Sequence, residues 1–241
     1  MENSFIPVDL LRTKAKCFNI ELDDKALERF NTYAKLLVEW NDKINLTAIT
    51  QPEEIVVKHF VDSLTIFSYV NIPEGAKVID VGTGAGFPGL AMLIARPDIE
   101  LTLIDSTNKK LNVIRDILEK TELEANVVHI RAEQAGQDKN FREKYDFATA
   151  RAVANLRDLS EYCLPFVKVG GSFISMKSAK TVEETEQAKG AIKTLGGKIK
   201  QIDSFNLFDS GERTIIHVKK ISSTPDKFPR PSAKMAKFPL K

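Results

Sequence analysis

The sequence of 241 residues predicts an α/β fold, with a doubly wound, mainly parallel sheet preceded by helices. A glycine-rich turn, residues 82–89, joins a predicted buried strand to a predicted helix. Strand-like and helix-like segments alternate from Ala76 onward. After Gly196 two strands follow with only a turn at residues 209–211 between them. We therefore expect a seven-stranded sheet that ends in an antiparallel pair.

The N-terminal part of the chain has helical patterning. A first helix is predicted over residues 3–18, where apolar residues are spaced for one helix face. A second is predicted to run to about residue 40, after an aspartate that is a good N-cap. A third, over 52–67, has proline in its first turn and acidic residues that complement the helix dipole. We expect residues 1–67 to form a helical extension packed on the core.

The remaining elements define the predicted sheet. Five strands are expected in its parallel part, at residues 77–81, 101–104, 126–130, 146–150 and 171–176. A helix over 109–123 separates the second of these strands from the third. The final pair of strands is expected at 198–205 and 213–219. We expect residues 68–221 to form one domain, since the length suits a single α/β unit.

Residues 222–241 differ from the rest of the chain in composition. They contain four of the ten prolines and show no hydrophobic period, so we expect a flexible, extended tail. From His217 onward the chain carries seven of its 35 basic residues and one of its 33 acidic residues. The remainder has 28 basic and 32 acidic residues, a net charge of −4. A nearly neutral body with a basic tail suggests an anionic partner that is met at one end.

The composition argues against several classes of protein. With 43% hydrophobic and 28% charged residues, the chain resembles a globular domain, and no apolar run reaches the length of a membrane span. The first ten residues lack a signal-peptide pattern, so we expect a cytoplasmic protein with no membrane partner. The cysteines, Cys17 and Cys163, and the three scattered histidines form no metal-ligand spacing, so we expect no metal.

The glycine-rich turn indicates the kind of ligand, because its glycines let backbone N–H groups approach a ligand at a helix N-terminus. The dinucleotide pattern requires a further glycine where this chain has Phe87. With Asp80 before Gly82 and Gly84, the segment resembles motif I of the S-adenosylmethionine-dependent methyltransferases. That resemblance implies a Rossmann-like seven-stranded methyltransferase fold, S-adenosylmethionine as cofactor, and contact between Asp80 and the methionine ammonium group. A tight turn in another α/β fold is the alternative.

Polar side chains follow the other predicted strands, and the carboxyl ends of parallel strands meet at one crevice. Asp105 can accept hydrogen bonds from a ribose diol or cap the next helix. Ala132 leaves room for an adenine ring, and Glu133 can read the amino group of adenine or remain a solvated charge. Arg151 can contact the cofactor carboxylate, hold the acceptor or form only a salt bridge. We favour a place for Arg151 in the crevice, as a catalytic residue.

Several longer motifs point to one family. They are Trp40-Asn-Asp-Lys-Ile-Asn-Leu-Thr47, His59-Phe-Val-Asp-Ser63, Asp80-Val-Gly-Thr-Gly-Ala-Gly-Phe-Pro-Gly89, Arg131-Ala-Glu133 and Thr149-Ala-Arg-Ala-Val153. Over nearly the whole chain they resemble the bacterial 16S rRNA guanine-N7 methyltransferases, also called glucose-inhibited division protein B. The resemblance implies methyl transfer to one guanine of the small-subunit rRNA or of its assembly intermediate. It also implies cofactor contacts at Gly82, Phe87, Ala132, Glu133 and Arg151.

The residues fit that reaction without a general base. Guanine N7 carries a lone pair and no proton, so it can attack a sulfonium methyl directly, and catalysis then depends on alignment. The chain lacks the Pro-Pro motif common in amine methyltransferases, and Cys163 lies in an apolar pattern that suits the core. His59 and Asp62 share one helix face, either as a surface pair or as a wall of a substrate pocket. A small-molecule methyltransferase and a non-catalytic RNA-binding protein remain alternatives.

Cations at one strand end and in the tail are candidates for RNA contact. They are Lys177, Lys227, Arg230, Lys234 and Lys237, with two tail phenylalanines that can stack on unpaired bases. The tail lacks a glycine and a proline that the family usually keeps, which leaves its conformation open. A solvated terminus is the alternative role. If the tail binds RNA, removal of residues 222–241 should weaken RNA binding and leave cofactor affinity unchanged.

Overall fold

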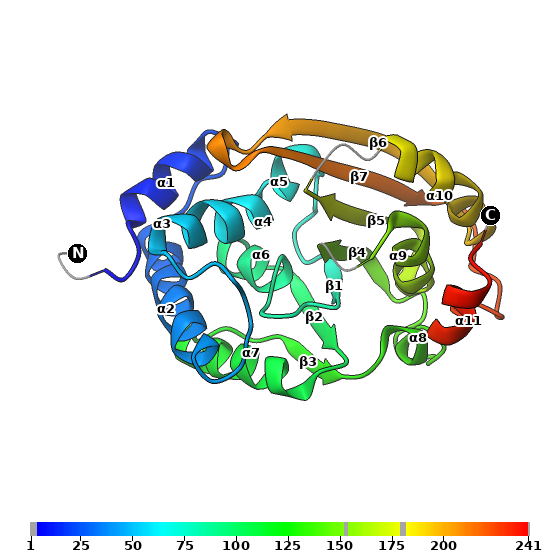
Figure 1. Cartoon of the computed structure of the whole chain (residues 1–241), viewed down its shortest axis with the longest axis horizontal. Helices are drawn as coiled ribbons and strands as arrows, with labels where there is room; N and C mark the ends of the chain where they lie inside the picture. The colour runs from blue at the N-terminus through cyan, green and yellow to red at the C-terminus, as the bar shows by residue number, and fades with distance from the viewer. Residues whose placement is uncertain (1–3, 152–153, 179–181, 241) are drawn as a thin grey trace.

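A computed structural model shows a mixed α/β molecule built on one seven-stranded sheet (Figure 1). It describes residues 4–151, 154–178 and 182–240, so Ala152 and Val153 of the fourth-strand motif and Lys241 of the tail lie outside it. The strand order is β3-β2-β1-β4-β5-β7-β6, and β7 pairs antiparallel with both β5 and β6. The predicted fold class is confirmed. The strands are β1 (Lys77–Val81), β2 (Glu100–Asp105), β3 (Asn126–His129), β4 (Tyr145–Arg151), β5 (Val167–Lys177), β6 (Gly197–Asn206) and β7 (Glu212–Lys220).

The helices of the N-terminal half lie where the sequence predicts them, although α1 begins at Val8 rather than at residue 3. Asp23 is the N-cap of α2, and its carboxylate accepts from the Ala26 N–H at 2.7 Å. Residues 52–69 form successive helical segments that include a π-helical turn, η1. The segments are α1 (Val8–Lys16), α2 (Asp24–Asn41), α3 (Pro52–Ile55), η1 (Val56–Val61), α4 (Asp62–Leu64), α5 (Ile66–Tyr69), α6 (Gly89–Ala95) and α7 (Asn108–Thr121).

The described part of the C-terminal half contains four helices for which the sequence predicted no bounds. Asn155 caps α9 by accepting from the Asp158 N–H at 3.0 Å. Short 3-10 turns, η2 (Leu164–Phe166) and η3 (Phe208–Ser210), precede β5 and β7. The helices are α8 (Ala132–Ala135), α9 (Leu156–Cys163), α10 (Val182–Thr194) and α11 (Ser232–Lys237).

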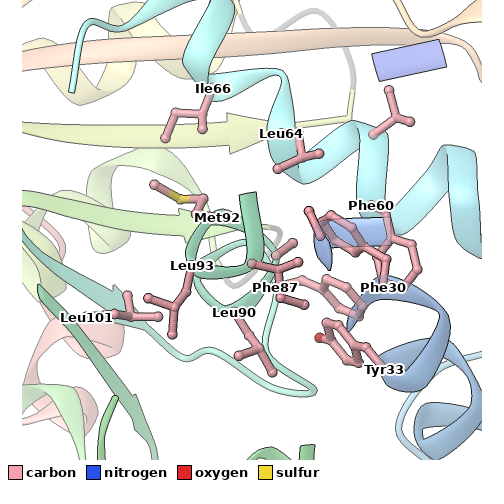
Figure 2. Close-up of a cluster of buried hydrophobic side chains, with 14 of the residues drawn as sticks. Phe30, Tyr33, Phe60, Leu64, Ile66, Phe87, Leu90, Met92, Leu93 and Leu101 are labelled. Atoms are coloured by element: carbon pink, nitrogen blue, oxygen red, sulfur yellow. The ribbon is translucent and has the colours of Figure 1, made fainter. Parts of the chain in front are cut away.

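Two apolar clusters cover the two faces of the sheet. On one face, the N-terminal helices pack with α6 and α7 around Phe30, Tyr33 and Phe60, which are fully buried (Figure 2). The indole N–H of Trp40 donates to Asp116 on α7 at 2.7 Å, which ties the end of α2 to this layer. On the other face, α9 covers β4 and β5, and α10 packs against α9 and β6. Burial on both faces accounts for the nearly continuous apolar runs of the parallel strands.

The C-terminal segment differs from the flexible, extended tail that its composition predicts. Residues from Thr224 onward fold back toward α8 and α9, and α11 lies beside α8 (Figure 1). Phe228 and Met235 are buried, at 3% and 2% exposure. Arg230 forms three hydrogen bonds to Glu161, which is itself only 2% exposed. A short apolar anchor and a buried ion pair therefore order a segment that has no hydrophobic period.

Neither a membrane span nor a metal cluster is found in the part of the chain that the structure describes. Within residues 4–151, 154–178 and 182–240, no helix combines the length and apolarity that crossing a membrane requires. The same residues bring together no group of three or more histidine, cysteine, aspartate or glutamate side chains suited to a metal ion.

Candidate functional site

The glycine-rich turn after β1 forms the floor of the site. Gly82 and Gly84 have φ of +70° and +59°, which side chains with a Cβ rarely adopt. The Gly84 N–H donates to Oδ2 of Asp105 at 3.0 Å, so the end of β2 fixes the turn. A Cβ added at Gly84 would meet nothing within 4 Å. The backbone of Gly84 therefore faces open space.

That space is a cavity of about 510 Å³, here named the first cavity, at the carboxyl ends of β1 to β4. Its volume falls within the range of small-molecule sites, roughly 300–1,000 Å³. The predicted residues Gly82, Gly84, Asp105, Ala132, Glu133 and Arg151 all line it. Other lining residues include Thr107, Lys110, Ile130, Leu159, Tyr162 and Ser232.

Asp105 has both of the roles considered from the sequence. Its Oδ2 accepts from Gly84, and its Oδ1 accepts from the Thr107 N–H at 2.8 Å at the start of α7. It also lines the first cavity and is 8% exposed. A carboxylate offers about four lone-pair positions. Asp105 can therefore hold the turn and still accept from a ligand.

Asp80 lies beneath the turn and does not line the first cavity. Its Oδ2 accepts from the Thr83 hydroxyl at 2.6 Å and from the Gly89 N–H at 3.0 Å, and its Oδ1 accepts from Thr149 at 3.2 Å. Burial raises the pKa of Asp80 to about 6, although these hydrogen bonds act in the opposite direction. Asp80 is placed to shape the glycine turn, because it joins both of its ends to β4.

Phe87 is also beneath the site rather than in it. Its ring stacks on Tyr33 at 5.1 Å and on His59 at 4.5 Å between ring centroids. Figure 2 shows Phe87 between the N-terminal helices and α6, close to Tyr33 and Phe60. The Arg151 guanidinium carbon lies 4.8 Å from the centroid of the Phe87 ring. The aromatic residue that distinguishes this turn from a dinucleotide turn is therefore a support for Arg151.

Arg151, at the end of β4, is held by groups from the N-terminal helices. Its guanidinium donates to Asp62 at 3.0 Å and lies 3.3 Å from Nδ1 of His59. The other oxygen of Asp62 accepts from Arg213, at the start of β7, at 2.9 Å. Nε2 of His59 bonds the hydroxyl of Thr47 at 2.8 Å. Arg151 thus forms a salt bridge, which was the alternative considered from the sequence, and it also lines the first cavity.

His59 and Asp62 belong to this buried network rather than to a surface pair. They are 8% and 7% exposed. Burial, and next the nearby Arg151 charge, lower the pKa of His59 to about 3, so its ring is neutral at pH 7. Their position on one helix face is the sequence signal for this pair. Sequence reasoning missed Arg213, because the pattern around it indicates only the start of a strand.

A second cavity, of about 170 Å³, lies on the other side of Arg151. Arg151 is the residue that both cavities share within the described part of the chain. The apolar side chains of Met176, Phe205 and Ile215 form part of the wall of the second cavity. Its polar lining residues are Lys58, His59, Asp62, Thr65, Lys177, Ser178, Arg213 and Thr214.

The predicted RNA-contacting cations fall into two groups. Lys177 is paired with Glu184 at 2.7 Å, and Arg230 with Glu161 at 2.7 Å, and both cations are largely buried. Lys227, Lys234 and Lys237 are exposed on the C-terminal segment. The structure therefore places Lys177 at the second cavity, Arg230 in a structural ion pair, and three lysines on the surface.

Two curated relatives are similar to this chain over nearly its whole length. A ribosomal RNA small subunit methyltransferase G from Acetivibrio thermocellus is 48% identical over 233 residues, which are 96% of each chain. One from Clostridium novyi (strain NT) is 44% identical over 242 residues and covers both chains completely.

Solved structures show the fold alone, because their sequences are distant. The fibrillarin/Nop5p complex matches with a TM-score of 0.54 at 12% identity, over 73% of this chain and 88% of that chain. The precorrin-6y C5,15-methyltransferase of Geobacter metallireducens GS-15 matches with a TM-score of 0.51 at 15% identity, over 77% of this chain and 97% of that chain. A family model described as GidB, rRNA small subunit methyltransferase G, matches residues 26–216. The chain therefore belongs to the GidB family of rRNA small subunit methyltransferases G.

Proposed function

We propose that this protein is an S-adenosylmethionine-dependent methyltransferase that modifies N7 of one guanine in bacterial 16S rRNA. Membership of the GidB family and the names of its full-length relatives support the reaction. The observation that carries the proposal is the position of Arg151, which lines both the first cavity, of a size that suits the cofactor, and the second cavity. As an rRNA-modifying enzyme, the protein would act in the cytoplasm.

The first cavity offers groups suited to the ribose, the adenine and the carboxylate of S-adenosylmethionine. Gly84 leaves open space that a Cβ would fill, and Gly82 has a positive φ that favours glycine. Asp105 offers carboxylate oxygens to the ribose diol, and Ala132 and Glu133 form the adenine end at β3. Arg151 supplies a positive charge for the methionine carboxylate at the opposite end. When bound, the cofactor supplies an electrophilic methyl group.

The second cavity is the place where we propose the target guanine enters. Met176, Phe205 and Ile215 offer apolar surface to a base. Arg151 and Arg213 share the single carboxylate of Asp62, which leaves net positive charge for the adjoining RNA backbone. The tertiary network around Asp62 holds Arg151 and Arg213 in fixed positions before RNA arrives. A base in this cavity would contact Arg151, which also borders the first cavity. The chain thus contributes alignment of two reactants, which is a recognised source of catalysis.

No residue of the two cavities is required to remove a proton, since N7 of guanine carries none. His59 is the histidine that borders this region, and its pKa of about 3 keeps it neutral. A neutral ring can orient Arg151 through Nδ1 while Nε2 is held by Thr47. Asp80, with a pKa of about 6, is separated from the reactants by the glycine turn.

We expect the single-turnover rate of methyl transfer to be nearly constant between about pH 6.5 and 8. The folded-state pKa of His59, about 3, lies below this range, and so does that of Asp80, about 6. Rapid-quench measurements with saturating RNA and cofactor would test this, with RNA structure checked at each pH. A tenfold rise per pH unit would point to an essential base and a different acceptor atom.

The exposed tail lysines should contribute to RNA binding. Replacing Lys227, Lys234 and Lys237 with alanine should lower the slope of log affinity against log salt by roughly 2 to 3, if each lysine contacts one phosphate. A control variant replaces Lys16, Lys25 and Lys120, which are exposed on α1, α2 and α7. An unchanged slope in the tail variant would show that these three lysines have no role in RNA recognition.

Label transfer separates the competing functions. Purified protein is incubated with methyl-labelled S-adenosylmethionine and one of three substrates. These are small-subunit particles, protein-free 16S rRNA and an RNA-free metabolite extract, each prepared from cells that lack the protein. The proposal expects label in the rRNA. Label only in the metabolite fraction would favour a small-molecule methyltransferase, and cofactor binding without any transfer would favour a non-catalytic RNA-binding protein.

A further inference from the structure

Glu133 has an arrangement that leaves one carboxylate oxygen for a ligand. It lies on α8 at the adenine end of the first cavity, and its side chain is 14% exposed. Oε1 accepts from the hydroxyl of Ser232 at 3.0 Å and lies 3.8 Å from a guanidinium nitrogen of Arg131. Both contacts use the same oxygen. Within the described part of the chain, Oε2 therefore has no such partner and is available to a donor in the cavity.

Ser232 reaches Glu133 from 99 positions away in the sequence. It is the first residue of α11 and also lines the first cavity. Figure 1 shows α11 against α8, at the side of the molecule where the chain ends. Arg131 is mostly exposed, at 61% of its side chain, so its ion pair with Glu133 is screened by solvent. The hydrogen bond from the Ser232 hydroxyl is shorter than this ion pair, and it is the better-defined restraint on the Glu133 carboxylate.

The segment before Ser232 is firmly attached to the same part of the protein. One guanidinium nitrogen of Arg142 donates to the carbonyls of Gly136 and Phe228, at 2.9 and 2.7 Å. The Gln137 amide donates to the Pro229 carbonyl at 3.0 Å. The three bonds between Arg230 and Glu161 fix the backbone two residues before Ser232. Ser232 is thus presented to Glu133 by an ordered segment.

We propose that Ser232 is a positioning residue for the cofactor, which holds Glu133 so that Oε2 accepts from the exocyclic amino group of adenine. The inference rests on the proposed function, since it assumes an adenine-bearing cofactor in the first cavity. It gives the C-terminal segment a role in cofactor binding. Removal of residues 222–241 is then expected to weaken cofactor affinity, contrary to the expectation from the sequence that this affinity stays unchanged.

The test compares two ligands that differ at one position of the purine. S-adenosylhomocysteine carries the 6-amino donor, and its 6-deamino analogue carries only hydrogen at that position. By calorimetry, Ser232→Ala should weaken binding of the adenosyl ligand about 5- to 10-fold, which is the size of one ordinary hydrogen bond. Affinity for the 6-deamino ligand should stay within about twofold of the wild-type value, because that purine has no N–H donor for Oε2.

Matched variants separate positioning from a general effect on the fold. Ser232→Thr keeps the hydroxyl and should bind both ligands as the wild type does. Ser232→Val has the shape of threonine without the hydroxyl and should behave as the alanine variant. Ser222→Ala, an exposed serine of the same segment outside the cavity, should change neither affinity. In a Glu133→Ala background, removing the Ser232 hydroxyl should cause no further loss.

The possible results are distinct. Unchanged adenosyl affinity in both Ser232→Ala and Ser232→Val would overturn the inference, and so would an equal loss for both ligands. The alanine and valine variants could fail to fold while Ser232→Thr folds. In that case, the ratio of the two ligand affinities is measured for Ser232→Thr and for the same variant with Glu133→Ala added. An equal ratio in the two proteins would also overturn the inference. If the wild-type protein binds neither ligand, the proposed function itself fails.

Discussion

Replacing Arg151 with alanine is expected to lower the single-turnover rate of methyl transfer about 10²- to 10³-fold, as loss of a well-positioned charged group does in other active sites. Arg151 borders both cavities, so its removal disturbs the cofactor and the target base together. Its guanidinium is fixed by Asp62, His59 and the Phe87 ring, so the charge is already in place before the substrates bind.

The fold should survive this substitution, because Arg213 remains to neutralise Asp62. Circular dichroism and the melting temperature would check this, and rapid quench with labelled cofactor would give the rate. Arg115→Ala, which removes an exposed arginine of α7, is the control and should react at the wild-type rate. A folded Arg151→Ala protein with near-normal turnover would restrict Arg151 to the salt bridge with Asp62.

Gly84→Val is expected to abolish cofactor binding, with affinity at least about 10²-fold weaker than that of the wild type, because it places a branched side chain in the ligand's space. The φ of +59° at Gly84 disfavours any side chain, and the position opens into the first cavity. Its N–H also donates to Asp105, so strain here would displace a second cofactor-facing residue. Calorimetry with S-adenosylhomocysteine measures the effect.

Gly75→Val is a matched control for the strain alone. Gly75 has a similar φ of +69° and open space at its Cβ, but it lies before β1 and outside the first cavity. Its valine variant should lose stability and retain cofactor affinity. If Gly84→Val folds and binds with unchanged affinity, the glycine turn is not the cofactor site.

Much of this fold could be predicted from local patterns in the sequence. Glycine spacing after β1 locates the turn, because only glycine tolerates the backbone angles at Gly82 and Gly84. Alternation of strands and helices then places Asp105, Glu133 and Arg151 at one sheet edge, since the carboxyl ends of parallel strands coincide. These predictions needed only local pattern and the general rule for such sheets.

The supporting contacts could not be predicted in the same way, because they join distant segments. Asp80 and Phe87 belong to the motif, yet the structure places both beneath the cavity, where they hold the turn and Arg151. The tail lacks periodicity, and its composition therefore predicts a mobile segment. Composition cannot reveal that Arg230 meets a buried Glu161 69 positions away, or that Ser232 meets Glu133.

The position of the transferred methyl group tests the central claim most directly. The purified protein is incubated with methyl-labelled S-adenosylmethionine and with 16S rRNA or small-subunit particles from cells that lack the protein. The RNA is then treated with borohydride and aniline, which cleave it at N7-methylguanine. We predict label at a single guanine and strand scission at that same nucleotide. Label on RNA that resists this cleavage, or label at an exocyclic amine, a carbon or a ribose, would contradict the account.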